Sequence, residues 1–323
     1  MQMIHSVSPS IDIAYPSVDV IIPTFNASRT LGRCLESVLK QKYPGKINII
    51  VVDGGSSDNT VSIAHDFGIP VLNFIGSYLA GLDGARHFGE KVTSSDYVWY
   101  VDSDDIMVEE TVLEDLITPM MNDISINLSL PQIAYSITDS GLNNWLSAME
   151  SMNVESTKRK GISIGSSVIL EDISYGLTNG ALLRRSVLNA AGGYDSDFRL
   201  LRRIRKLKLS KGIVIGSAHY YHEQTAGMRD FFLKWSKRIN RYGQMDDEKL
   251  SKYFYEWPTS KADHHDNVYG TVIGPLNYAY LSVIHFIRMR QAFWLWSLVY
   301  LSLLIGIVLK NPINSYRSLA RFL

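Results

Sequence analysis

Three carboxylates lie within four residues of one another, at Asp102, Asp104 and Asp105, and they directly follow the apolar segment Tyr97 to Val101. Concentrating negative charge in this way is costly unless a cation neutralises it. Mg²⁺ and Mn²⁺ bind carboxylate oxygens from one side and phosphate oxygens from another. A solvated acidic turn or a helix N-cap would use the same residue type. The pattern therefore predicts either a divalent-cation site or an acidic turn.

A second polar cluster, Asp53-Gly54-Gly55-Ser56-Ser57-Asp58, follows the apolar segment Ile47 to Val52. Glycines let a ligand approach the backbone closely, and Asp53 offers acceptors to a base or a ribose. The segment is neither a dinucleotide fingerprint nor a P-loop, because no Gly-Lys-Ser/Thr follows it. An ordinary strand–turn–helix connection, with Asp58 as the helix cap, fits the same residues.

The elements that must position these clusters alternate along the first hundred residues. We expect strands at 18–23, 47–52, 71–74 and 97–101, with helices at 31–39, after Asp58 and at 80–91. Strands joined by helices indicate an α/β fold with a doubly wound, mostly parallel sheet, in which ligands bind beyond the carboxyl ends of the strands. Both clusters, and Thr24 to Asn26, lie at such ends.

The later part of the chain has a weaker pattern. We place no element between about 122 and 174. Beyond it we expect a loop–helix–loop at 176–194, a basic helix at 200–210, a short strand at 213–215 and a helix at 227–242.

Composition excludes several classes of protein. The 323 residues hold 32 Lys and Arg against 32 Asp and Glu, which argues against nucleic acid as a partner. The sole cysteine, Cys34, rules out an internal disulfide and a cysteine-rich metal cluster. Cys34 lies on an apolar helical stripe, so we expect a buried core thiol.

The C-terminal part is apolar. Ala292 to Leu309 carries no charge and would span about 27 Å as a helix, close to the hydrocarbon thickness of a bilayer. The preceding segment, Asn267 to Ile287, is interrupted by Gly and Pro and resembles an interfacial or re-entrant piece; burial of both segments in a soluble protein is the alternative. Met1 to Ser17 does not have the pattern of a signal peptide. We therefore expect a cell-membrane protein with a cytoplasmic catalytic domain.

Taken together, the segments from Val18 to Thr60, GARHFG at 84–89 and YVWYVDSDD at 97–105 closely resemble the family 2 glycosyltransferases, which have a GT-A fold. A second patch, Thr178 to Tyr194, resembles the acceptor-side segment of that family. The resemblance covers about half of the chain.

The resemblance implies roles for individual residues. Pro23, Thr24 and Asn26 would border the nucleotide base, and Asp53 would bind that base. Asp102, Ser103 and Asp104 would form the D-x-D motif. The resemblance also implies that Arg86 lies near the ribose or diphosphate. It implies a metal site, formed by Asp102, Asp104 and His222, that holds Mg²⁺ or Mn²⁺.

One departure from the family pattern concerns the acceptor side. The family commonly carries a Glu-Asp pair after Gly-Gly-Tyr-Asp, and its Asp is the general base; this chain has no such pair. Asp195 or Asp197 would then serve as the base. A phosphate acceptor needs no base, and Arg202 and Arg203, in a run of basic residues from Arg199 to Lys211, would hold its charge. A solvated helix, or one lying on anionic lipid, accounts for the same run.

These observations lead to one expected organisation: an N-terminal extension at 1–17, a GT-A catalytic domain at 18–245 with donor and acceptor halves at about 18–120 and 121–245, and a helical membrane-associated region at 246–323. The expected activity is an inverting, metal-dependent transfer of a hexose from a UDP- or GDP-linked sugar to a lipid-linked acceptor, either a polyprenyl phosphate or a lipid-linked saccharide. A non-catalytic protein that binds nucleotide sugars is the alternative.

Overall fold

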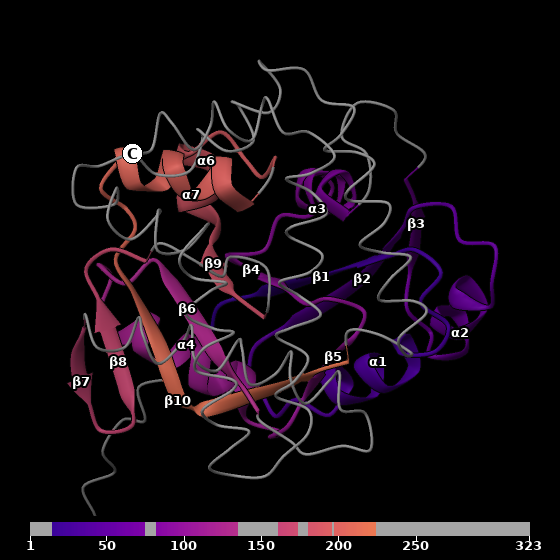
Figure 1. Cartoon of the computed structure of the whole chain (residues 1–323), viewed down its shortest axis with the longest axis horizontal. Coiled ribbons are helices and arrows are strands. Elements are labelled where there is room, and N and C mark those ends of the chain that lie inside the picture. Colours follow the sequence, from indigo (N-terminus) through magenta and orange to yellow (C-terminus); the bar gives the residue numbers. More distant parts are fainter. Residues whose placement is uncertain (1–14, 75–81, 135–160, 174–179, 196, 224–323) are drawn as a thin grey trace, which may run out of the picture.

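The computed structural model describes residues 15–74, 82–134, 161–173, 180–195 and 197–223. Their strands form one sheet with the order β3-β2-β1-β4-β9-β6-β10-β8-β7, and β5 pairs with β10 (Figure 1). The strands are β1 Val18–Thr24, β2 Ile47–Asp53, β3 Val71–Asn73, β4 Tyr97–Tyr100, β5 Asp105–Met107, β6 Leu128–Ile133, β7 Ile162–Ile164, β8 Ser167–Leu170, β9 Leu182–Arg184 and β10 Gly212–His222.

The sheet is mostly parallel, as the sequence predicts. β3, β2, β1 and β4 pair in parallel, and β6 pairs in parallel with β10. β9 lies antiparallel between β4 and β6, and β5, β7 and β8 also pair antiparallel. The fold is therefore α/β with a mixed sheet, whose first half matches the expected strand–helix alternation.

Two apolar cores lie on opposite faces of this sheet, because successive side chains of a strand point to opposite faces. Val20 and Ile22 of β1 belong to the core that contains α1 (Leu31–Leu39), α2 (Thr60–Asp66) and α4 (Val112–Asn122). Ile21 belongs to the other core, with α3 (Leu82–Lys91), α6 (Arg185–Ala190) and α7 (Asp197–Lys206). In Figure 1, α3, α6 and α7 lie above the strands and α1 lies below them. Cys34 is a fully buried core thiol, as expected.

The second half of the sheet differs from the expected elements. The segment expected to be a loop–helix–loop contains β9, a short strand whose Leu182 and Leu183 are buried between β4 and β6. The strand expected at 213–215 continues to His222. The basic helix begins at Asp197 and ends at Lys206. Three further strands, β6, β7 and β8, lie where no element was expected.

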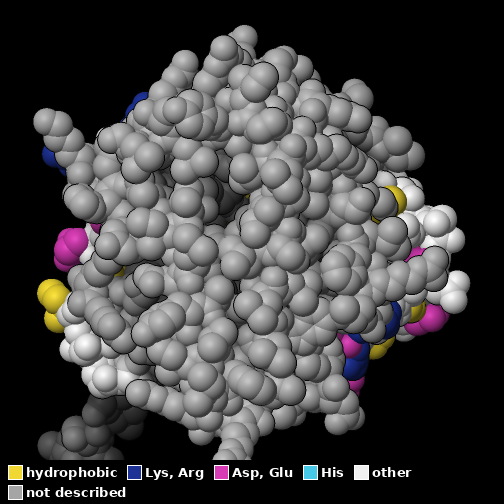
Figure 2. All heavy atoms as spheres, in the orientation of Figure 1, with side chains coloured by type: hydrophobic (Ala, Val, Ile, Leu, Met, Phe, Trp, Pro, Cys, Tyr) yellow, Lys and Arg dark blue, Asp and Glu magenta, His cyan; other side chains and the backbone are white. Residues whose placement is uncertain are grey.

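The predicted membrane segments at 267–287 and 292–309, and the helix predicted at 227–242, lie outside the described residues. Within the described ranges, no helix combines the length and the apolar character that a membrane crossing needs. In Figure 2, acidic and basic side chains of described residues lie next to each other at the lower right border, on the side of α1, so neither sign of charge dominates that border.

Candidate active site at the carboxyl ends of the strands

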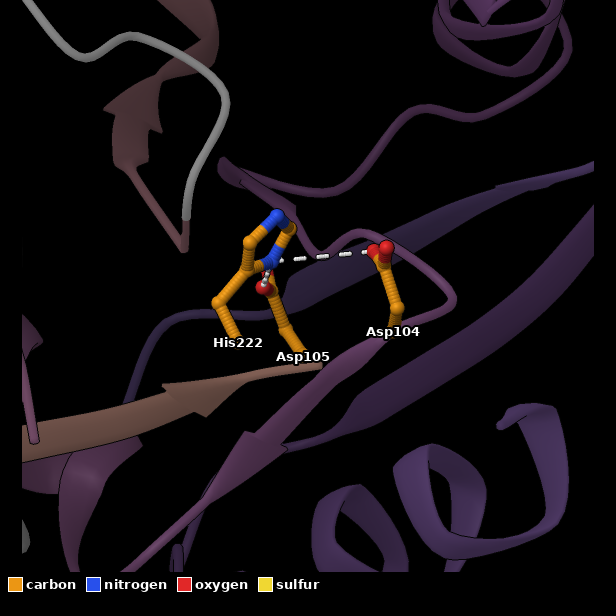
Figure 3. A group of neighbouring side chains, drawn as sticks. All are labelled: Asp104, Asp105 and His222. Carbon is orange, nitrogen blue, oxygen red and sulfur yellow. Dashed lines mark hydrogen bonds and ion pairs between the residues drawn. The ribbon is translucent and has the colours of Figure 1, made fainter. Parts of the chain in front are cut away.

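The acidic loop meets a histidine that lies more than a hundred residues further along the chain. The chain leaves β4, passes through Asp102 and Asp104, and enters β5 at Asp105, whose register partner on β10 is His222. The Nδ1 atom of His222 lies 2.5 Å from Oδ1 of Asp105 and 3.7 Å from Oδ1 of Asp104 (Figure 3). One potential ligand atom from each of the three residues falls within 4.8 Å of the others.

The environment of Asp105 favours a nearby cation. Its side chain is fully buried, and its pKa is raised to about 7: burial is the largest cause, the Asp102 and Asp104 carboxylates act in the same direction, and His222 opposes them. The Asp102 amide donates to Oδ2 of Asp105 at 3.1 Å, which fixes the carboxylate in the loop. Carboxylate oxygens are the ligands that Mg²⁺ and Mn²⁺ prefer, and a neutral imidazole can complete such a set. Asp104, Asp105 and His222 therefore fit a divalent cation.

Asp102 has a different partner from the one expected for a metal ligand. Its Oδ1 atom accepts a hydrogen bond from Nη2 of Arg86, so the carboxylate forms an ion pair beside the cluster. Arg86 is 4% exposed, and its Nη1 atom lies 3.5 Å from the Tyr194 hydroxyl and 3.6 Å from Oδ1 of Asp83. The structure thus brings Asp104 and His222 together as the metal prediction requires, adds Asp105, and places Asp102 against Arg86. Ser103 lies half-buried in the same loop.

The loop after β2 is held by Asp53. Its Oδ1 accepts from the Thr24 hydroxyl at 3.0 Å and from the Ser56 hydroxyl at 2.5 Å, and its Oδ2 accepts from the amides of Gly55 at 3.0 Å and Ser56 at 2.8 Å. A carboxylate offers about four acceptor positions, and Asp53 is 1% exposed. Its carboxylate therefore holds the turn together. Pro23 is also buried and lies near the end of the neighbouring strand β1.

The loop after β1 is joined to the same turn. Asn26 adopts a left-handed backbone with φ of 51°, which Asn tolerates better than most residues. Its Oδ1 accepts from the Ser57 amide at 2.9 Å, and its own amide donates to the Ser56 hydroxyl at 2.8 Å. Asp58 accepts from the amides of Thr60 and Ser28; burial raises its pKa, but these groups outweigh that effect and hold the pKa at about 2. Asp58 thus binds the first residue of α2, but the N-cap of this helix is Asn59 and not Asp58 as the sequence predicts.

On the acceptor side, the structure separates the two predicted arginines. Arg203 donates to the carbonyls of Ala191 and Gly193, at 2.6 and 2.5 Å, and to Oδ2 of Asp195 at 2.8 Å. Arg202 is exposed on the same helix. Arg203 therefore holds the Gly-Gly turn and the candidate base Asp195. Asp197 begins α7, and its side chain lies outside the described part of the structure.

Sequence reasoning gave no separate role to two residues of this site. Asp105 belongs to the acidic cluster, but the sequence of the three aspartates does not show which of them faces His222. Tyr194 was part of the acceptor-side patch; its hydroxyl donates to Asp83 at 2.9 Å and its carbonyl lies 2.5 Å from Nδ1 of His87. Its ring packs on Tyr100 at 5.2 Å between centroids. Tyr194 thus ties the acceptor-side turn to α3 and Arg86, a contact for which the sequence carried no signal.

The chain resembles known proteins both in sequence and in fold. Residues 19–192 match the family model described as glycosyl transferase family 2. An N-acetylglucosaminyltransferase of Mesorhizobium japonicum is 35% identical over 127 residues, which cover 38% of this chain and 30% of that protein. The Escherichia coli protein named UDP-Glc:alpha-D-GlcNAc-diphosphoundecaprenol beta-1,3-glucosyltransferase WfgD is 32% identical over 109 residues, covering 33% of this chain and 43% of its own. The alignments thus span less than half of these curated relatives.

Among solved structures, the mannosyltransferase PcManGT from Pyrobaculum calidifontis, in complex with GDP-Man and Mn²⁺, superposes with a TM-score of 0.62. The match covers 94% of this chain and 88% of that chain at 15% identity, so it shows a common fold. The family match extends over more than half of the chain and includes the acidic loop, Arg86 and the loops after β1 and β2. The chain therefore belongs to the glycosyl transferase family 2 and has the GT-A fold.

Proposed function

We propose that this chain is an inverting, metal-dependent glycosyltransferase that moves a hexose from a UDP- or GDP-linked sugar to a lipid-linked acceptor. The observation that carries the proposal is the cluster of Asp104, Asp105 and His222 at the carboxyl ends of the strands, inside a family 2 fold. The relatives support the donor class: one is named as using UDP-Glc, and PcManGT is described in complex with GDP-Man and Mn²⁺.

The residues of the site divide the work. The leaving group of sugar transfer is a nucleoside diphosphate, and a divalent cation bound by Asp104, Asp105 and His222 would offset the charge that develops on it. Arg86 adds a buried positive charge next to Asp102 on the same edge. The joined loops after β1 and β2 border the base, with Asp53 and Asn26 holding their shape.

The acceptor proposal rests on the missing Glu-Asp pair. Asp195, one candidate base, is bound by Arg203. A polyprenyl phosphate brings its own nucleophilic oxygen and needs no base, whereas a lipid-linked saccharide would need Asp195 or Asp197. The name of the WfgD relative, which specifies a diphosphoundecaprenol-linked acceptor, supports a lipid carrier.

A donor screen tests the proposal. Purified full-length protein is incubated with UDP- and GDP-sugars, Mn²⁺ or Mg²⁺, and either undecaprenyl phosphate or a membrane lipid extract, and nucleoside diphosphate release is measured. We expect release that needs one donor, a divalent cation and lipid. The missing Glu-Asp pair favours one alternative, a non-catalytic protein; donor binding by calorimetry without any release would support that alternative and contradict our proposal.

We also propose that residues 246–323 hold the protein at the cytoplasmic face of the cell membrane, because Ala292 to Leu309 carries no charge. Truncation after Asp266 should move the protein from the membrane fraction to the soluble fraction. Recovery of the full-length protein in the soluble fraction without detergent would contradict membrane attachment.

A further inference from the structure

Glu223 is the residue after His222, and it joins three parts of the molecule. Its carboxylate forms ion pairs with Arg29 and Arg33, one oxygen to each guanidinium. Its amide donates to the Asp104 carbonyl at 2.9 Å. The Glu223 side chain is 14% exposed, although the two arginines are about half exposed. One residue therefore connects the start of α1, the end of β10 and the acidic loop.

The position of these contacts matters because they lie directly beside the cluster, where β10 ends. The pairing of β5 with β10 runs through three residue pairs and ends at His222 with Asp105. Beyond that pair, the Glu223 amide fixes the backbone of Asp104, and the two arginines fix the Glu223 side chain. Arg29 and Arg33 belong to the segment that continues from the loop after β1, which carries Thr24 and Asn26. A shift of Glu223 would move two of the three cluster residues.

We propose that Glu223, clamped by Arg29 and Arg33, is a positioning residue for the cation site of Asp104, Asp105 and His222. This inference rests on the proposed function, since it requires that the cluster binds a divalent cation. Groups that orient metal ligands from outside the coordination sphere typically change metal affinity by 10- to 100-fold when they are lost. Glu223 does so through the backbone of Asp104 and through the end of β10.

Two variants test the positioning role, and the second separates it from a simple effect of charge. Glu223→Gln removes both ion pairs and keeps the size of the side chain. The double variant Arg29→Gln/Arg33→Gln keeps the Glu223 carboxylate and removes two positive charges. Removing positive charge near a cation site strengthens cation binding if only charge matters. Positioning predicts the opposite result, because the clamp is lost in both cases.

The measurement is the dissociation constant of Mn²⁺ alone, from the electron paramagnetic resonance signal of unbound Mn²⁺, with full-length protein. We expect it to rise about tenfold in Glu223→Gln and in the double variant. The matched control is Glu110→Gln, which removes an exposed carboxylate that pairs with Lys42 at 2.7 Å; we expect no change there. Chemical denaturation of each variant reports any separate loss of stability.

Each outcome bears on the inference. Unchanged or tighter Mn²⁺ binding by the double variant overturns it, as does a Glu223→Gln value equal to that of Glu110→Gln. A loss of stability with unchanged Mn²⁺ affinity assigns the clamp a structural role only and also overturns it. If the unmodified protein binds no Mn²⁺, the metal part of the proposed function fails together with the inference. If it binds Mn²⁺ and only the variants disagree, the inference alone fails.

Discussion

Two buried aspartates lie at opposite ends of the sheet, and their surroundings treat a negative charge differently. Asp19, near the start of β1, accepts from the amide and the hydroxyl of Ser95, both at 2.7 Å, from Asn48 at 3.0 Å, and from Arg185 at 2.7 Å. Burial raises the pKa of its carboxyl, but the hydrogen bonds and the Arg185 charge outweigh that effect and lower it. Neighbouring groups of the protein therefore compensate the negative charge of Asp19.

Asp105, beyond the end of β4, has the opposite balance. His222 offsets its burial only in part, two further carboxylates lie beside it, and its pKa is raised. Asp19 therefore stabilises the fold at the amino ends of the parallel strands. Asp105, at their carboxyl ends, would be stabilised by a further positive charge. The comparison teaches that the partners of a buried acid, and not its burial, distinguish a structural group from a candidate site.

The largest effect is expected at the cluster of Asp104, Asp105 and His222. If the proposed function holds, Asp104→Ala should lower transfer by about 10³-fold, because it removes one of the charges that would hold the cation. Nucleoside diphosphate release with saturating Mn²⁺ measures this, and circular dichroism checks folding. Asp172→Ala removes an acid that pairs with Arg205 and serves as the control. A rate near that of the unmodified protein would remove Asp104 from the metal site.

At Asp19 we expect an effect on stability and not on cation binding. Asp19→Ala should lower the free energy of unfolding by about 3 kcal/mol, because Arg185 and the Ser95 amide lose a buried partner. Denaturant titration measures the loss, and Mn²⁺ affinity of the folded variant should stay unchanged. An Asp19→Ala variant with normal stability and weakened Mn²⁺ binding would contradict the assignment of a structural role to Asp19 and of a binding role to the cluster.

Asp53 combines features of both aspartates. It lies at the carboxyl end of β2, as a binding residue would, but it is hydrogen-bonded as fully as Asp19. We expect Asp53→Ala to raise the donor dissociation constant about tenfold, the equivalent of one or two polar contacts. Calorimetry with the donor found in the screen measures it. If donor affinity is unchanged and only stability falls, Asp53 belongs with the structural acids despite its position.

Asp105→Asn should act in the direction opposite to a change at Asp19. The amide keeps an acceptor for His222 and removes the charge that burial disfavours. At pH 8 we therefore expect the free energy of unfolding to stay level or to rise by up to about 1 kcal/mol, while Mn²⁺ binding weakens. Denaturation at pH 8 checks this, and a clear destabilisation would mean that the ionised carboxylate is satisfied in the folded protein.

The smallest effect concerns pH. The pKa of Asp19 is lowered from 3.8 in the folded protein, so the unfolded chain binds more protons in acid. The stabilisation from Asp19 is therefore fully present above about pH 4 and is lost as the pH falls through the folded pKa. Thermal melting between pH 5 and 3 should show a shallower decline for Asp19→Asn than for the unmodified protein. Parallel curves would show that the Asp19 pKa is not lowered.

The sequence predicts the first half of the fold well, because each strand there is a short apolar run and α1 places Leu31, Leu35 and Val38 at helical spacing. It predicts less of the second half. All three residues of β7 are exposed, so no alternation marks that strand. β10 is interrupted by Gly-Ser-Ala at 216–218, where its register on β6 shifts between Val214 and His219, and the apolar pattern therefore stops early.

The site divides in the same way. The acidic loop is visible as a motif, and the resemblance to the family indicates His222. The partners within the site are set by pairings that no local pattern encodes. Asp105 faces His222 because β5 pairs with β10, and Asp102 faces Arg86 because α3 packs beside β1.

The β5–β10 pairing also has a consequence for the order in which the molecule is completed. A ribosome delivers the acidic loop more than a hundred residues before His222, and the register that brings them together exists only once β10 has entered the sheet. A nascent chain that ends within the family-matched segment, at 192, carries the carboxylates without their histidine. A cation site built from all three residues would thus be completed only after the other described strands have been made.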